Sequence, residues 1–205
     1  MNAGNSRAPG VIDEQITRVE ARVSELPDRL QAHIERARTI GRELSAIFGV
    51  DSLRVDLALA GHDLYRAASD EEMLETATRR GIVPGALDLE QPLMLHGPLA
   101  AIWMADEGGV ADKEVLDAVQ HHTTFAPGLG PLAATVFLAD KIEPDKVERR
   151  PWLTAVADLA HGGDWKDAVR AYIERLDAEL KRQGVTPHPL AMRAFDALGK
   201  PVVDA

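Results

Sequence analysis

The stretch LQAHIERARTIGRELSAIFG, residues 30–49, carries the pattern that decides the fold. Its core-facing positions recur at steps of three and four residues, which is the period of an amphipathic helix. They are Leu30, His33, Ala37, Ile40, Leu44 and Ile47. Gly49 follows as a helix stop signal. The stretch therefore predicts one helix whose apolar stripe includes a histidine.

The same spacing extends through the rest of the chain, and strict alternation over several residues is hard to find. We therefore predict an all-α fold. Ser69 with Glu72 forms a capping-box signature, and Asp112 can cap the helix that runs to His122. A loop is expected between Pro84 and Pro92. The other helices are expected at about 12–26, 52–61, 69–81, 93–103, 112–122, 131–143, 165–183 and after Pro189.

The 205 residues suit one domain with a sizeable buried core. We expect a loose N-terminal tail over residues 1–10, a helical domain over 11–199 and a short tail over 200–205. Within the domain, helices at about 151–199 follow a core at about 30–150.

Charge and cysteine content exclude several classes of protein. The chain has 33 acidic and 23 basic residues, a formal charge of −10, which argues against diffuse binding to nucleic acid or anionic membrane. Without cysteine there are no disulfides and no thiolate ligands, so a metal would need histidine and carboxylate. The N-terminus lacks a secretory pattern and no stretch resembles a membrane span, so we expect a cytoplasmic protein.

Six ionisable residues stand where the helical pattern demands an apolar side chain, or directly beside such a position. They are His33, His62, Asp63, His96, His122 and Asp140. A buried histidine can donate to a backbone carbonyl, and a buried aspartate can pair with a cation, so each alone has a structural explanation. Together they form a nitrogen and oxygen ligand set that suits iron, manganese, cobalt or zinc. The pattern selects His122 over its neighbour His121.

Three segments give this set a resemblance to a known family: LMLHGPLAA at 93–101, QHHTT at 120–124 and FLADKIEP at 137–144. Over about 30–150 the chain resembles the YqeK family, which are HD-domain symmetrical diadenosine tetraphosphate hydrolases. The resemblance implies a single HD-domain helical bundle with its metal site between helices. It also implies one metal held by four residues, with iron the suggested ion: His33, His62, Asp63 and Asp140. His96 and His122 would hold a second metal or contact phosphate, with Asp63 able to bridge.

The implied function is metal-dependent hydrolysis of dinucleoside tetraphosphate into two nucleoside diphosphates by a metal-activated hydroxide. Asp63 would orient the nucleophile, while Arg66 and Lys146 would neutralise the leaving phosphate. Helical spacing predicts that Lys141 turns away from Asp140, so it ranks below Arg66. The segment Thr124 to Pro127 departs from the glycine-rich family pattern and leaves the nucleotide preference open.

Other readings of the sequence stay open. The chain could hydrolyse another nucleotide, such as a mononucleotide or a cyclic or guanosine alarmone, or be a non-catalytic HD-like interaction module. Glu143 either contacts a metal-binding histidine from outside or only begins the Pro144 turn. His161 and His188 are predicted to be helix-end or loop residues. The oligomeric state is open, a homodimer among the options.

Overall fold

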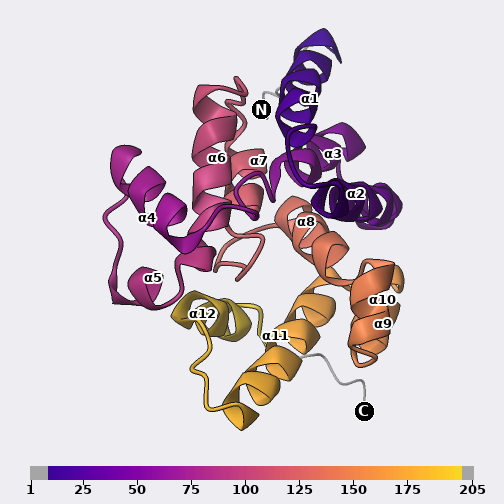
Figure 1. Cartoon of the computed structure of the whole chain (residues 1–205). Coiled ribbons are helices and arrows are strands. Elements are labelled where there is room, and N and C mark those ends of the chain that lie inside the picture. The colour runs from indigo at the N-terminus through magenta and orange to yellow at the C-terminus, as the bar shows by residue number, and fades with distance from the viewer. Residues whose placement is uncertain (1–8, 200–205) are drawn as a thin grey trace, which may run out of the picture.

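The computed structural model describes residues 9–199, and this part of the chain contains helices and no strands (Figure 1). The all-α prediction is therefore confirmed. The elements are α1 (Pro9–Val23), α2 (Asp28–Phe48), α3 (Ser52–Gly61), α4 (Asp70–Arg79), α5 (Ala86–Glu90), a 3₁₀ helix η1 (Pro92–Leu95), α6 (His96–Asp106), α7 (Lys113–Gln120), α8 (Pro131–Lys141), α9 (Pro144–Arg149), α10 (Leu153–His161), α11 (Trp165–Arg182) and α12 (Pro189–Ala197).

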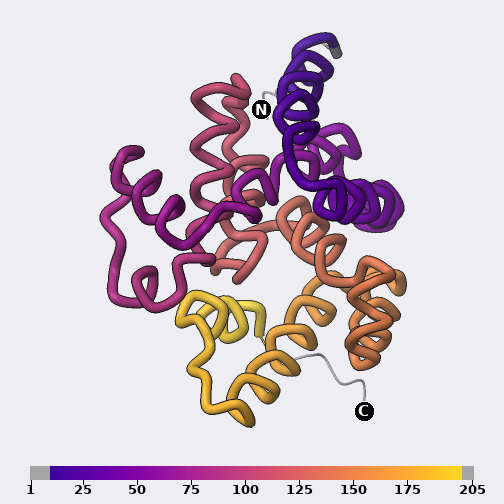
Figure 2. Tube along the Cα trace, in the orientation of Figure 1, coloured from indigo at the N-terminus to yellow at the C-terminus, as the bar shows by residue number. Residues whose placement is uncertain are grey.

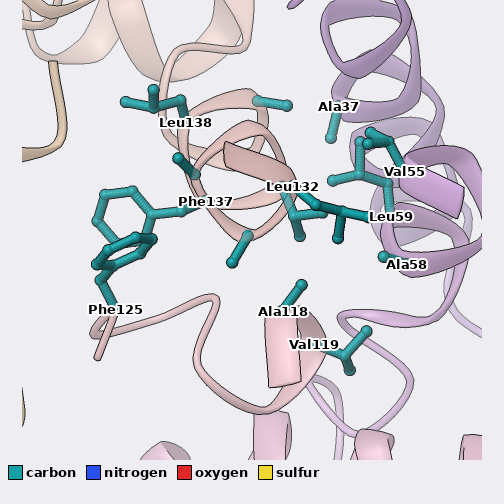
Figure 3. Packing of buried hydrophobic residues seen from close by; sticks show 14 of the residues in the cluster. Ala37, Val55, Ala58, Leu59, Ala118, Val119, Phe125, Leu132, Phe137 and Leu138 are labelled. Atoms are coloured by element: carbon teal, nitrogen blue, oxygen red, sulfur yellow. The ribbon is translucent and has the colours of Figure 1, made fainter. Parts of the chain in front are cut away.

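Helix α8 is the centre of the fold. Every residue from Leu132 to Lys141 is buried, because α2, α3, α7, α10 and α11 all pack against it. Figure 3 shows Leu132 and Phe137 of α8 facing apolar side chains of α3, α7 and the 125 turn. A helix that is apolar all round belongs in a core. The position of α8 therefore places Asp140, near its C-terminal end, deep in the molecule.

Helices α2 and α3 pack closely at Gly41, and the buried face of α2 differs from the predicted stripe. A Cβ on Gly41 would lie 2.2 Å from Cδ1 of Leu59, so a larger residue there would require the Leu59 side chain to move. The buried residues of α2 are Ile34, Ala37, Gly41, Leu44 and Ser45. Ile47, predicted to face the core, is 41% exposed. The prediction was wrong there because the face of α2 that its neighbours bury passes through Gly41 and Ser45, and Ile47 lies off that face.

The predicted helix signals are found with small differences. Ser69 and Glu72 form the expected capping box, and Gly49 ends α2 with a φ of 66°. The side chain of Asp112 caps α7, which ends at Gln120 and not at His122. The segment between Pro84 and Pro92 was predicted to be a loop, and this was wrong, since it contains the one-turn helix α5.

The C-terminal helices form a second layer beside α8. Figure 2 shows α11 and α12, orange to yellow, below the central helix, and α11 packs directly on α8. Arg170 of α11 donates a 2.7 Å hydrogen bond to the carbonyl of Phe195 in α12. Helix α1 begins at Pro9, inside the predicted 1–10 tail; the rest of that tail and the 200–205 tail lie outside the described residues. No helix in the described part has the length and apolarity to span a membrane.

Candidate metal centre

Six side chains from five separate segments converge at one buried point. The ends of three helices contribute His62 and Asp63 after α3, His96 at the start of α6, and His122 after α7; His33 comes from α2 and Asp140 from α8. They form three overlapping groups of three residues, each group with its ligand atoms within 4.8 Å of one another. The convergence agrees with the sequence prediction, because the six are the candidate ligands.

Asp63 lies in the middle of the cluster and faces both sides of it. Its Oδ2 is 3.6 Å from Nε2 of His33 and 3.6 Å from Nε2 of His62. Its Oδ1 is 3.3 Å from Nε2 of His96 and 3.5 Å from Nε2 of His122. Asp140 lies on the side of the cluster formed by His33 and His62, and its Oδ1 is 3.1 Å from Nε2 of His33. The carboxylate of Asp63 therefore has the position of a bridge between two pairs of histidines.

Backbone carbonyls determine which ring nitrogen faces the centre. Nδ1 of His62 lies 2.7 Å from the carbonyl of Leu59, and Nδ1 of His122 lies 2.8 Å from that of Val119. Nδ1 of His96 contacts the carbonyl of Leu93 in the same way. A carbonyl only accepts, so each Nδ1 carries the hydrogen, and a neutral ring then has its Nε2 lone pair directed into the cluster.

Two of the four inward nitrogens make no hydrogen bond to the described part of the chain. Nε2 of His33 and Nε2 of His62 are buried and have no hydrogen-bond partner within residues 9–199. Nε2 of His96 and Nε2 of His122 are 3.0 Å apart, and two lone pairs at that distance repel unless a cation lies between them. Together with two carboxylates, these four nitrogens fit a transition-metal ion.

Burial and charge set the protonation of the cluster. Burial lowers the pKa of His122 to about 3, so this ring is neutral near pH 7. Burial alone would also lower the pKa of His62, but the negative charges of Asp63 and Asp140 outweigh it and raise that pKa. For Asp140, burial would raise the pKa, and Lys141 and Lys146 instead hold it well below its usual range. The centre therefore presents carboxylates that attract a cation.

Lys141 and Lys146 both reach Asp140, which corrects one prediction. Lys141 was expected to turn away; instead its buried Nζ pairs with Oδ2 of Asp140 and donates a 3.1 Å hydrogen bond to the carbonyl of His122. The flexible four-carbon side chain bends back, so the Cβ direction does not determine where the ammonium lies. Lys146 donates a 2.7 Å hydrogen bond to the carbonyl of Asp140 and pairs with its Oδ1.

Glu143 takes both of the roles that the sequence left open. Its fully buried carboxylate lies 3.5 Å from Nδ1 of His33 and accepts a 2.7 Å hydrogen bond from Nε of Arg36. It also accepts from the backbone N–H of Asp145 at the start of α9. Glu143 thus lies beside His33, the one cluster histidine that no backbone carbonyl holds, but its Oε1 makes no hydrogen bond to that ring within the described residues.

A small pocket opens onto the cluster. It has a volume of about 90 Å³, and its lining includes Asp63, Asp140 and three cations, Arg66, Lys141 and Lys146. Arg66 is exposed at this opening, as a phosphate-binding side chain would be. His121 lies outside the cluster, and His161 and His188 are at a helix end and a helix cap, as predicted.

Two kinds of group around the histidine cluster were not predicted from the sequence: the side chain of Thr123 and the backbone carbonyls. Thr123 places Oγ1 3.4 Å from Nε2 of both His96 and His122. The position of Thr123 directly after His122 was the only signal for it. The carbonyls that orient the histidines have no sequence signal, because every residue carries one.

The chain is similar in sequence to proteins of known name. The chain is 35% identical over 104 residues to the symmetrical bis(5'-nucleosyl)-tetraphosphatase of Bacillus subtilis, and 29% identical over 136 residues to the protein of that name in Staphylococcus aureus. The match to the first covers 51% of this chain and 55% of the relative, so the similarity spans about half of the relative's length. No family model matches the chain.

The fold matches a solved structure over nearly its whole length. A protein of Clostridium acetobutylicum, described as a predicted HD superfamily hydrolase involved in NAD metabolism, superposes with a TM-score of 0.79 and 22% identity. The superposition covers 92% of this chain and 95% of the other. The two proteins therefore have the same overall fold.

Proposed function

We propose that this protein is a metal-dependent hydrolase that cleaves dinucleoside tetraphosphates symmetrically into two nucleoside diphosphates. The observation that carries the proposal is the set of four inward histidine Nε2 atoms around Asp63 and Asp140, two of which, on His33 and His62, have no hydrogen-bond partner in the described part of the chain. The similarity to the tetraphosphatase of Bacillus subtilis supports the choice of substrate.

We propose His33, His62, Asp63 and Asp140 as ligands of one ion, and Asp63, His96 and His122 as the site of a second ion or of a phosphate. When bound, a transition metal supplies a Lewis acid for phosphoryl oxygens and activates water near neutral pH. Iron is our first choice because the resemblance to the YqeK family suggests it. Manganese, cobalt and zinc are alternatives, because they too accept imidazole and carboxylate donors.

The protein's own side chains prepare the substrate. Lys146 and Arg66 lie at the pocket where a polyphosphate enters, and their charges neutralise the diphosphate that leaves. Lys141 is the more buried of the two lysines that pair with Asp140: its side chain is 10% exposed, against 29% for Lys146, and its Nζ also donates to the carbonyl of His122. It therefore fixes the orientation of Asp140 rather than contacting phosphate.

Product analysis tests the function. The protein, loaded in turn with iron, manganese and cobalt, is incubated with diadenosine tetraphosphate, and the products are separated by chromatography. We expect ADP as the only nucleotide product. Formation of AMP with ATP would contradict symmetrical cleavage, and faster hydrolysis of another nucleotide in a parallel panel would reassign the substrate.

A metal measurement tests the site separately. We expect purified wild-type protein to contain a transition metal and the Asp63→Ala variant to lose it, since Asp63 contacts both halves of the cluster. A metal-free wild-type protein with undiminished activity would end the proposal.

A further inference from the structure

A second pocket lies directly beside the metal centre. It has a volume of about 190 Å³ and is lined by α8, α11, α12 and the segment between the last two helices. Met94 and Thr123 line both this pocket and the smaller one over the metal cluster. One extended ligand can therefore occupy both, with its charged part at the cluster and another part here.

The second pocket has walls suited to a flat, apolar ring. Phe137 and Tyr172 contribute aromatic surfaces, and Met94 and Met192 contribute thioethers that adapt to an aromatic ligand. Pockets for whole drug-sized ligands measure about 300–1,000 Å³. The smaller volume here fits one heterocycle and not an entire dinucleotide.

Asp177 is the only lysine, arginine, aspartate or glutamate among the residues that line this pocket. Its Oδ2 accepts a 2.7 Å hydrogen bond from Nζ of Lys181. Its Oδ1 is buried and has no hydrogen-bond partner within the described residues. A buried acceptor without a donor is costly, and a ligand N–H group placed beside it removes that cost.

Phe125 packs behind the aromatic side of the pocket, which Phe137 and Tyr172 form, and its backbone is strained. Phe125 has a φ of 60°, a left-handed conformation that is unfavourable for a side chain of this size. Its buried ring packs edge-to-face on Phe137, with centroids 5.5 Å apart, and Phe137 packs in the same way on Tyr172 at 5.1 Å. The unusual segment after QHHTT thus holds the wall of the second pocket in place.

We propose that this pocket binds one nucleobase of the substrate, and that Asp177 accepts a hydrogen bond from the exocyclic amino group of that base. The inference rests on the proposed function and adds a base-recognising residue to it. An adenine, with its 6-amino group as donor, satisfies Oδ1 of Asp177 while its ring lies between the methionine and aromatic side chains.

The Asp177→Asn variant tests the proposal with a matched substrate pair. The amide keeps an oxygen for Lys181 and offers its NH₂ to the base, so an acceptor becomes a donor. We expect KM for diadenosine tetraphosphate to rise about tenfold, the cost typical of a lost hydrogen bond to a charged group. KM for the tetraphosphate of purine riboside, which lacks the 6-amino group, stays within about twofold.

The control is Glu174→Gln, which removes a negative charge from an exposed position on the same helix. It should change neither KM. Equal rises for both substrates in Asp177→Asn, or no rise for either, would overturn the assignment. Circular dichroism and metal content equal to those of wild type confirm that the variant is folded and loaded.

Calorimetric titration with ADP separates this inference from the proposed function. If wild type hydrolyses diadenosine tetraphosphate but Asp177→Asn binds ADP as tightly as wild type does, the base pocket is wrong and the function stands. If wild type does not hydrolyse the tetraphosphate but binds ADP in a manner that depends on Asp177, the function is wrong and the pocket stands.

Discussion

At the scale of single residues, the same hydrogen bond between a histidine ring and the backbone occurs three times. His62, His96 and His122 each direct Nδ1 to the carbonyl three residues earlier, at Leu59, Leu93 and Val119. Each histidine lies within two residues of a helix end. A carbonyl oxygen has two lone pairs, so Leu93 and Val119 can accept from the imidazole as well as from the backbone, and these contacts orient the imidazoles toward the centre.

His121 and His122 are adjacent in the chain, so substituting each in turn tests which of them belongs to the cluster. We expect His122→Ala to lower kcat/KM at least about 100-fold, more than the loss of an outer-sphere partner costs. His121→Ala should stay within a few-fold, because His121 is not among the clustered side chains. Steady-state kinetics on both variants measures this, and equal losses would contradict the assignment within the pair.

At the scale of elements, the site depends on how closely α6 approaches the end of α7. Gly97 of α6 faces the backbone there: a Cβ would lie 2.9 Å from the carbonyl oxygen of Gln120 and 3.2 Å from Nδ1 of His122. Backbone atoms cannot yield as a flexible side chain does. The glycine in LMLHGPLAA is therefore required by packing, which lets His96 and His122 meet.

The Gly97→Ala variant should lose stability and metal together. Alanine favours a helix by about 0.5–1 kcal/mol over glycine, but overpacking here costs about 1–3 kcal/mol and displaces His122. Gly10→Ala in α1 is the control, since a Cβ there meets nothing within 4 Å. Urea denaturation and metal analysis of both variants provide the measurement. A stabilised Gly97→Ala protein with full metal content would refute the packing argument.

At the scale of the whole molecule, the centre joins helices from the N-terminal, middle and later parts of the chain around α8 (Figure 1). An ion bound by α2, α3, α6, α7 and α8 binds the folded state and not the unfolded chain. Metal binding should therefore stabilise the entire fold.

Thermal unfolding with and without manganese or cobalt tests this coupling. Metal at about 100 times its Kd adds about 2.7 kcal/mol, which for a chain of this size raises Tm by about 5–10 °C. Asp63→Ala should show no such rise.

The Tm rise should also depend on pH. The raised pKa of His62 means that its proton stabilises the metal-free fold below about pH 6.5, the unfolded value, and that this stabilisation fades as pH increases through the folded pKa. Metal must displace that proton, so the rise in Tm should shrink as pH falls, beginning above pH 6.5. A rise that is constant from pH 8 to 5.5 would contradict the role of His62.

The features that could be predicted from the sequence are those that depend on residues near one another in the chain. Helix periods, the Ser69 capping box and the Asp112 cap depend on neighbours in sequence, and so do the six polar residues at or beside core positions. Lys141 was misjudged because a long side chain chooses its partner through space. The exposed Ile47 was misjudged because it lies off the face of α2 that the neighbouring helices bury, and only their packing defines that face.

The sequence by itself determined that the chain is all-helical and which histidines and aspartates face inward, because helix period and residue type are local properties. Only the tertiary structure decided that Asp63 lies between two pairs of histidines, that Lys141 supports Asp140, and that a pocket with Asp177 opens beside the centre. Those features depend on distances between helices far apart in the chain, which packing alone establishes.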